Sequence, residues 1–70
     1  MRFDVFGTPV EVLAREGQWL VFYLGSEGKK RLATDIIIPP QITESQVRGY
    51  LADIRHEYAS QEHPQVTRIS

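Results

Sequence analysis

The sequence contains no cysteine and no excess of charge of either sign. Without thiols the chain can form no disulfide bond and no cysteine-based catalytic or metal site, so its stability must come from packing, with or without a partner chain. Its 8 Lys and Arg residues nearly balance 9 Asp and Glu residues, for a formal net charge of −1. This balance argues against a protein that binds nucleic acid or an anionic membrane mainly through bulk electrostatics.

Long apolar segments are also missing. The longest apolar run, Trp19 to Leu24, is far shorter than the roughly 18 residues that a membrane span requires. The first ten residues contain Asp4 and lack the apolar stretch of a signal peptide. We therefore expect a cytoplasmic protein with no membrane partner. The length of 70 residues predicts one small domain over residues 1–70 and excludes a cleft between two lobes.

The first half of the sequence is divided by turn signals into four short extended segments. These turns are expected at Gly7–Thr8, at Glu16–Gly17 and at Gly25–Gly28. Such spacing predicts an antiparallel β-meander of three to four strands. The segments are Arg2 to Phe6, Val10 to Arg15, Gln18 to Leu24 and Lys30 to Ile38. Residues 60–70 are predicted to form either a loose tail or an extra edge strand.

A helix is predicted from residue 43 to about residue 59. Thr43 is a favourable N-cap, and Gln46 three residues later can complete a capping box. Gly49 lies in the middle of the helix, where glycine costs about 1 kcal/mol relative to alanine. Either a neighbouring helix needs this missing side chain or the residue is neutral there. The apolar residues at helical spacing are Val47, Tyr50, Leu51, Ile54 and Tyr58.

Two-residue loops in all three hairpins would give the predicted sheet one almost uniformly apolar face. The helix is expected to pack on this face, which makes the fold class α+β, an antiparallel meander with one C-terminal α-helix. Arg31 is expected on the opposite face. The predicted core face comprises Phe3, Val5, Val10, Val12, Ala14, Trp19, Val21, Tyr23, Leu32, Thr34 and Ile36.

The opposite face of the predicted sheet also carries large apolar residues, although one helix cannot cover both faces. An exposed apolar patch of this kind usually marks an interface. We therefore expect a homodimer or a small protein partner there. Two alternatives stay open: the tail covers the patch through Val66 and Ile69, or an odd-length hairpin loop exchanges the faces downstream. The predicted interface residues are Leu13, Leu20, Phe22 and Leu24, with Phe6 near the edge.

The sequence shows no arrangement typical of an active site. None of its serines lies in a nucleophile elbow, and no glycine cluster links a strand to a helix as in phosphate-binding loops. His56 and His63 are the only histidines, and Pro64 makes it difficult for one helix to present both. With neighbouring carboxylates they could hold a divalent ion, but no compact ligand spacing is present. We therefore expect no catalytic, cofactor-binding or metal-binding residues.

One run of positive charge, Lys29, Lys30 and Arg31, follows Gly28 at the tip of the third hairpin. Basic residues beside the aromatic residues of a sheet can bind single-stranded nucleic acid, and this run is the candidate contact. The alternative is that these cations only solubilise the hairpin and protect a sheet edge. Nucleic acid is the less favoured partner.

Several segments carry a resemblance to known families: MRFDVFG, FYLGSEGKKR, IIIPP and the EHP tail. Together they resemble short bacterial proteins of unknown function, a resemblance that implies no activity. The strand order and the TESQVRGYLADI helix are similar in layout to HicB-type antitoxins, although Gly25–Gly28 and the basic run replace the apolar, proline-containing loop of those proteins. The sequence thus predicts a non-catalytic binding or accessory module that self-associates. The alternative is an antitoxin-like or nucleic-acid-binding regulator.

Overall fold

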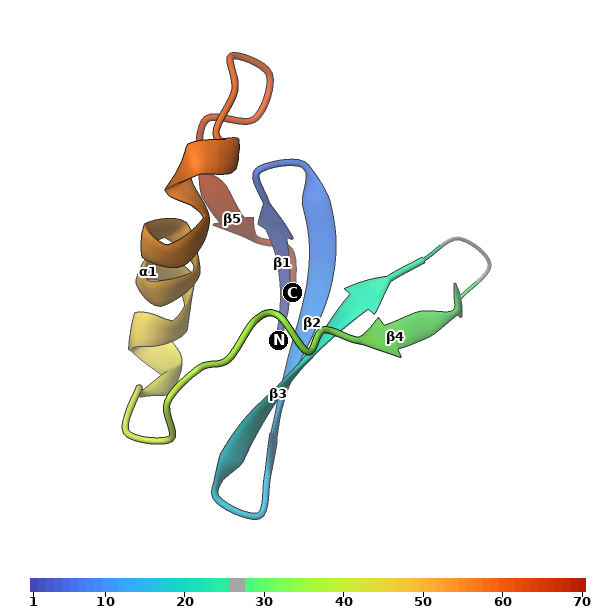
Figure 1. The fold of residues 1–70 in the computed structure, drawn as a ribbon, viewed down its shortest axis with the longest axis vertical. Coiled ribbons are helices and arrows are strands. Elements are labelled where there is room, and N and C mark those ends of the chain that lie inside the picture. Colours follow the sequence, from blue (N-terminus) through green and yellow to red (C-terminus); the bar gives the residue numbers. More distant parts are fainter. Residues whose placement is uncertain (26–27) are drawn as a thin grey trace.

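The computed structural model describes residues 1–25 and 28–70 and shows a five-stranded antiparallel sheet with one α-helix (Figure 1). The strand order is β4-β3-β2-β1-β5, a four-stranded meander to which β5 is added beside β1. The α+β class is confirmed, with five strands in place of the predicted three to four because the C-terminal segment pairs with β1. The strands are β1 Arg2–Val5, β2 Thr8–Arg15, β3 Gln18–Leu24, β4 Lys30–Leu32 and β5 Val66–Arg68.

The helix α1, Glu44–Arg55, begins where the capping signal predicts. The backbone N–H of Thr43 donates to Gln46 Oε1 at 2.9 Å, which satisfies a donor that the first turn would otherwise leave unpaired. The helix ends earlier than predicted. A 3₁₀ turn, η2, follows over His56–Tyr58, so Tyr58 leaves the apolar stripe of the helix and is 57% exposed.

Two hairpins contain a two-residue turn in which both residues have a positive φ angle. The turn between β2 and β3 is Glu16–Gly17, as predicted, with φ of 53° and 75°. The turn between β1 and β2 is Phe6–Gly7, with φ of 50° and 95°, and not the predicted Gly7–Thr8. Glycine is favoured at the second position of such a turn, which explains the shift. Because the shift changes the pairing by two residues, the faces of β1 are still those predicted.

The connection between β3 and β4 exchanges the faces of the sheet downstream. It spans residues 25–29, an odd number, and Leu32 pairs with Phe22. The prediction that placed Leu32 on the core face is therefore wrong, as is the prediction that placed Arg31 on the opposite face, since Arg31 pairs with Tyr23. Of the predicted Gly25–Gly28 turn, Ser26 and Glu27 lie outside the described residues.

The fourth segment stays in the sheet only as far as Leu32, whereas the sequence predicted extension to Ile38. A turn at Thr34–Asp35 directs the chain across the core face toward α1 (Figure 1). Ala33, Ile36 and Ile38 are buried along this return segment, residues 33–42. Ile42 at its end accepts a 2.8 Å hydrogen bond from the Trp19 indole N–H through its backbone oxygen. The return segment thus joins α1 in covering the sheet.

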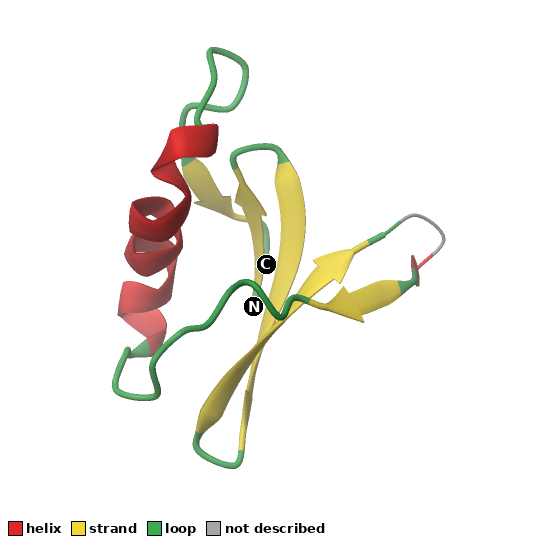
Figure 2. Cartoon of the chain, viewed as in Figure 1, coloured by secondary structure: helices red, strands yellow, loops and turns green. Residues whose placement is uncertain are grey.

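The core lies on a single face of the sheet. The helix contacts β1 and β5, and Figure 2 shows it on one side of the strands. Predicted core residues that are confirmed as buried include Val10, Val12 and Val21, whereas Ala14 near the end of β2 and Thr34 in the turn after β4 are exposed. The buried cluster is Phe3, Val5, Val10, Val12, Val21, Ala33, Ile36, Ile38, Val47, Leu51 and Val66.

Candidate functional site

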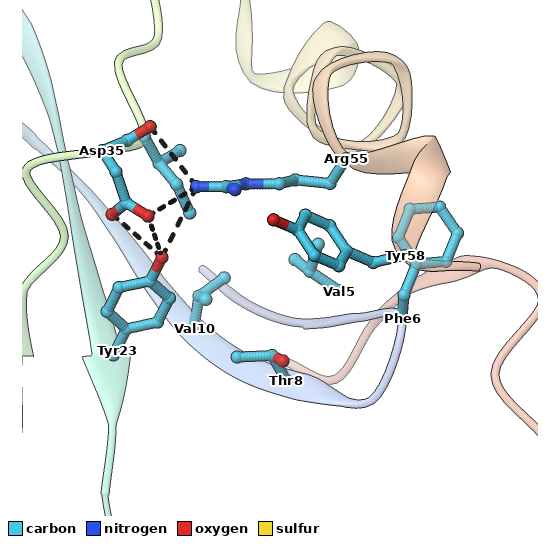
Figure 3. Close-up of a pocket in the computed structure, with 9 residues that line it drawn as sticks. Val5, Phe6, Thr8, Val10, Tyr23, Asp35, Arg55 and Tyr58 are labelled. Atoms are coloured by element: carbon cyan, nitrogen blue, oxygen red, sulfur yellow. Dashed lines mark hydrogen bonds and ion pairs between the residues drawn. The ribbon is translucent and has the colours of Figure 1, made fainter. Parts of the chain in front are cut away.

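A pocket of about 340 Å³ opens on the core face, where the end of the helix, the β1–β2 turn and the return segment meet (Figure 3). Its walls are mostly apolar, and one end is polar. Such a combination of apolar walls and a few polar groups is typical of small-molecule sites. The lining residues are Val5, Phe6, Thr8, Val10, Tyr23, Asp35, Ile36, Arg55 and Tyr58.

The polar end of the pocket is a cluster of Tyr23, Asp35 and Arg55, which come from β3, the return segment and the last turn of α1. The Tyr23 hydroxyl lies 2.9 and 2.8 Å from the two Asp35 carboxylate oxygens. Arg55 Nη2 donates to Asp35 Oδ2 at 2.8 Å and to its backbone oxygen at 3.3 Å. Three segments far apart in the sequence are thereby joined at one point.

The ionisation of these groups follows from their contacts. The hydrogen bond from Tyr23, and then that from Arg55, lower the pKa of Asp35 below its usual value. Burial, together with the hydrogen bond to Asp35 and its charge, raises the pKa of Tyr23. Burial opposes the charge of Arg55, but the hydrogen bond and charge of Asp35 outweigh it, so the pKa of Arg55 is raised. At neutral pH the cluster is therefore an ion pair with a protonated phenol.

The aromatic walls of the pocket lie beside this cluster. The Arg55 guanidinium is centred 5.5 Å from the Tyr58 ring, so the side chain covers that ring as Figure 3 shows. Phe6 is a turn residue with φ of 50°, a conformation that bulky residues rarely adopt. Its turn is held by Asp4 Oδ1, which accepts from the Gly7 N–H at 2.7 Å. Strained residues of this type are concentrated at functional sites.

The predicted interface residues of the strands lie on the sheet face away from α1, which we call the second face. Leu13, Leu20, Phe22 and Leu24 alternate with the buried residues of β2 and β3 and are partly exposed. Leu32 joins them opposite Phe22 and is 50% exposed. Phe6 is not among them, since it lines the pocket and packs against the core.

The tail does not cover the second face. Val66 is directed into the core and is 2% exposed, while Ile69 is 59% exposed. The second face also carries charged residues that pair with one another. Glu11 forms ion pairs with Lys30 at 3.0 Å and with Arg2 at 3.6 Å, and the hydrogen bond from Lys30 lowers the pKa of Glu11.

The basic run at the third hairpin is partly engaged within the chain. Besides its bond to Glu11, Lys30 Nζ lies 4.9 Å from the centre of the Phe22 ring. The Arg31 guanidinium lies 5.8 Å from the centre of the Tyr23 ring, and Lys29 is exposed. These cations therefore lie beside aromatic side chains, as the nucleic-acid hypothesis required, but two of them already contact those rings.

Neither histidine is among the residues that line the pocket, although the His63 ring lies against Gly7 of the β1–β2 turn. His56 Nδ1 is 3.1 Å from the Asp53 backbone oxygen, and His63 Nδ1 is 3.9 Å from Asp4 Oδ2. Within residues 1–25 and 28–70 no group of three potential metal ligands is found. In the same described part of the chain, no helix has the length and apolar character to cross a membrane.

Sequence reasoning did not find the pocket. Its polar cluster joins positions 23, 35 and 55, and neither a motif nor a periodicity links them. The only local signal was a basic residue in the last turn of the helix, where Arg55 is favoured by the helix dipole in any case.

The fold is a small α+β domain whose five-stranded sheet carries α1 on one face. The chain belongs to the family described as Domain of unknown function (DUF7661), whose model matches residues 1–70. No curated protein and no solved structure matches the chain.

Proposed function

We propose that the protein is a non-catalytic binding module that self-associates through its second face. The observation that carries this proposal is the partly exposed apolar patch of Leu13, Leu20, Phe22, Leu24 and Leu32, opposite the face that α1 covers. Removing such a patch from water is favourable by about 25 cal/mol per Å².

The charges on the second face are compatible with a second copy as the occupant. Arg2 of β1, Glu11 of β2 and Lys30 of β4 form a row of alternating sign. Because this row carries both signs, it does not repel its own copy, whereas a row of one sign would. The formal net charge of −1 adds little repulsion between chains.

The area of the second face agrees with this occupant. Its strands β1 to β4 have 4, 8, 7 and 3 residues, and at about 3.3 Å per residue and about 4.8 Å between strands they cover roughly 350 Å² in projection. Two copies would bury roughly 700 Å² in projection, the size of a weak or transient interface. We therefore expect a dimer of low affinity, joined face to face.

Sedimentation equilibrium of the full chain tests this function. We expect a dimeric mass for the wild type, and a Kd raised by about 30-fold or more in Phe22→Lys, the effect of a central contact worth about 2 kcal/mol. Leu32→Lys changes a half-exposed residue of the same patch and should weaken the dimer without unfolding the chain. Ile37→Lys is the matched control, because Ile37 is 74% exposed and belongs to the return segment.

The proposal is refuted if the wild type sediments as a monomer at a few hundred micromolar, or if Ile37→Lys dissociates the dimer as strongly as Phe22→Lys does. The regulatory alternative, antitoxin-like or nucleic-acid-binding, has less support. No match beyond the family points to an antitoxin, and Lys30 and Arg31 contact residues of their own sheet. The bacterial and cytoplasmic setting stays a prediction.

A further inference from the structure

The polar end of the pocket presents hydrogen-bond donors and acceptors side by side. In the described part of the chain, all hydrogen bonds of the Arg55 guanidinium are made by Nη2, and Nε and Nη1 have no acceptor. In the same described residues, every fully buried side-chain nitrogen or oxygen atom has a hydrogen-bond partner. Because Nε and Nη1 have no partner, they are accessible to solvent. The Asp35 side chain is 58% exposed and retains accepting capacity beside them.

The charge of this cluster is balanced. Arg55 and Asp35 form an ion pair at 2.8 Å, and the Tyr23 phenol is neutral. A ligand carboxylate would place a second negative charge beside Asp35, and an ammonium group would place a second positive charge beside Arg55. Arg31, over the Tyr23 ring, is exposed, so solvent and salt screen its charge.

A carboxamide fits this cluster without adding charge. Its carbonyl oxygen accepts from Arg55, and its N–H donates to Asp35, so both charged groups gain a hydrogen bond. The remaining walls, formed by Val5, Val10 and the rings of Phe6 and Tyr58, favour an apolar body attached to that group.

We propose that this pocket binds a small neutral ligand that joins an apolar ring to a carboxamide or to an equivalent edge with adjacent acceptor and donor. The volume of about 340 Å³ suits a ligand with one or two rings. The site lies on the core face, so it does not depend on self-association through the second face.

Three probes of nearly equal shape test the charge preference: phenylacetamide, phenylacetate and 2-phenylethylamine. Each is titrated into the ¹⁵N-labelled full chain, and amide shifts are followed by NMR. We expect phenylacetamide to bind with a Kd of roughly 0.1–1 mM, as ligands of this size allow. It should bind at least about fivefold more tightly than either charged probe. This ratio corresponds to the repulsion of about 1 kcal/mol between two like charges in contact at the water-exposed mouth of the pocket. The largest shifts should be at pocket residues.

Asp35→Asn supplies the decisive comparison. It leaves Arg55 without its counter-ion, so phenylacetate should become the preferred probe, while Asp53→Asn, outside the pocket, should keep the wild-type order. Wild-type shift dispersion in both variants confirms that they fold. The proposal is overturned if no probe binds below about 10 mM, if phenylacetate binds the wild type at least as well as phenylacetamide, if Asp35→Asn leaves the order unchanged, or if the shifts are on the second face.

Discussion

Substituting Val21 by threonine tests which face of β3 is the core. Val21 is 2% exposed, and threonine has nearly the same shape and suits a strand equally well. The change therefore buries a hydroxyl group without a designed partner, at a cost of about 1–3 kcal/mol. A domain of this length has roughly 3.5–10 kcal/mol of unfolding free energy, so the loss is a large share of it.

Leu32→Thr is the matched control, since Leu32 lies on the second face and is 50% exposed. At a concentration at which the proposed dimer would be dissociated, we expect this variant to lose less than about 1 kcal/mol of unfolding free energy. Urea unfolding followed by Trp19 fluorescence measures the stability of both variants. The Trp19 indole N–H donates a hydrogen bond to the Ile42 backbone oxygen, so its fluorescence reports docking of the return segment. If Leu32→Thr lost more stability than Val21→Thr, the assignment of the faces would be wrong.

Three further predictions concern the backbone and the ionisable cluster. Gly49→Ala should raise the unfolding free energy by about 1 kcal/mol in urea melts, since a methyl group there meets nothing within 4 Å; a loss would reveal a neighbour that needs the glycine. Glu16→Asn should add about 0.5–1 kcal/mol in the same assay, because asparagine tolerates the φ of 53° better; no gain would mean that this turn is unstrained. Since the pKa of Asp35 is lowered in the fold and that of Tyr23 is raised, stability should fall as pH drops below about 4 and as pH rises above about 10. In a plot of unfolding free energy against pH, Asp35→Asn should flatten the acid limb and Tyr23→Phe should flatten the alkaline limb. Unchanged slopes would exclude these two groups as the cause of the pH dependence.

The sequence predicted those parts of the fold that depend on local signals. Alternation through Val10, Val12 and Val21 is a period-two pattern that burial on one face produces, and the capping residues of α1 act within one helical turn. The Glu16–Gly17 turn likewise depends on a two-residue preference, which holds wherever the flanking strands are long.

The errors arose where the outcome depended on the length of a connection or on contacts distant in sequence. A shift of one residue in the pairing of β3 with β4 moved Leu32 to the second face. The pairing of Val66 with Val5 requires the chain to return from the far end of α1, and three-residue strands carry a weak pattern. The pocket joins Tyr23, Asp35 and Arg55 only after the turn that ends β4 early.

The central claim is that α1 and the return segment cover one face of the sheet and a second copy covers the other. Intermolecular NOEs in a sample that mixes ¹³C-labelled and unlabelled chains test it most directly. We expect cross-peaks between the Phe22 ring of one copy and the leucine methyl groups of the second face of the other. NOEs that instead link Phe22 to Leu51 within one chain would contradict the account. The absence of any intermolecular NOE in a sample concentrated enough to be fully dimeric would contradict it as well.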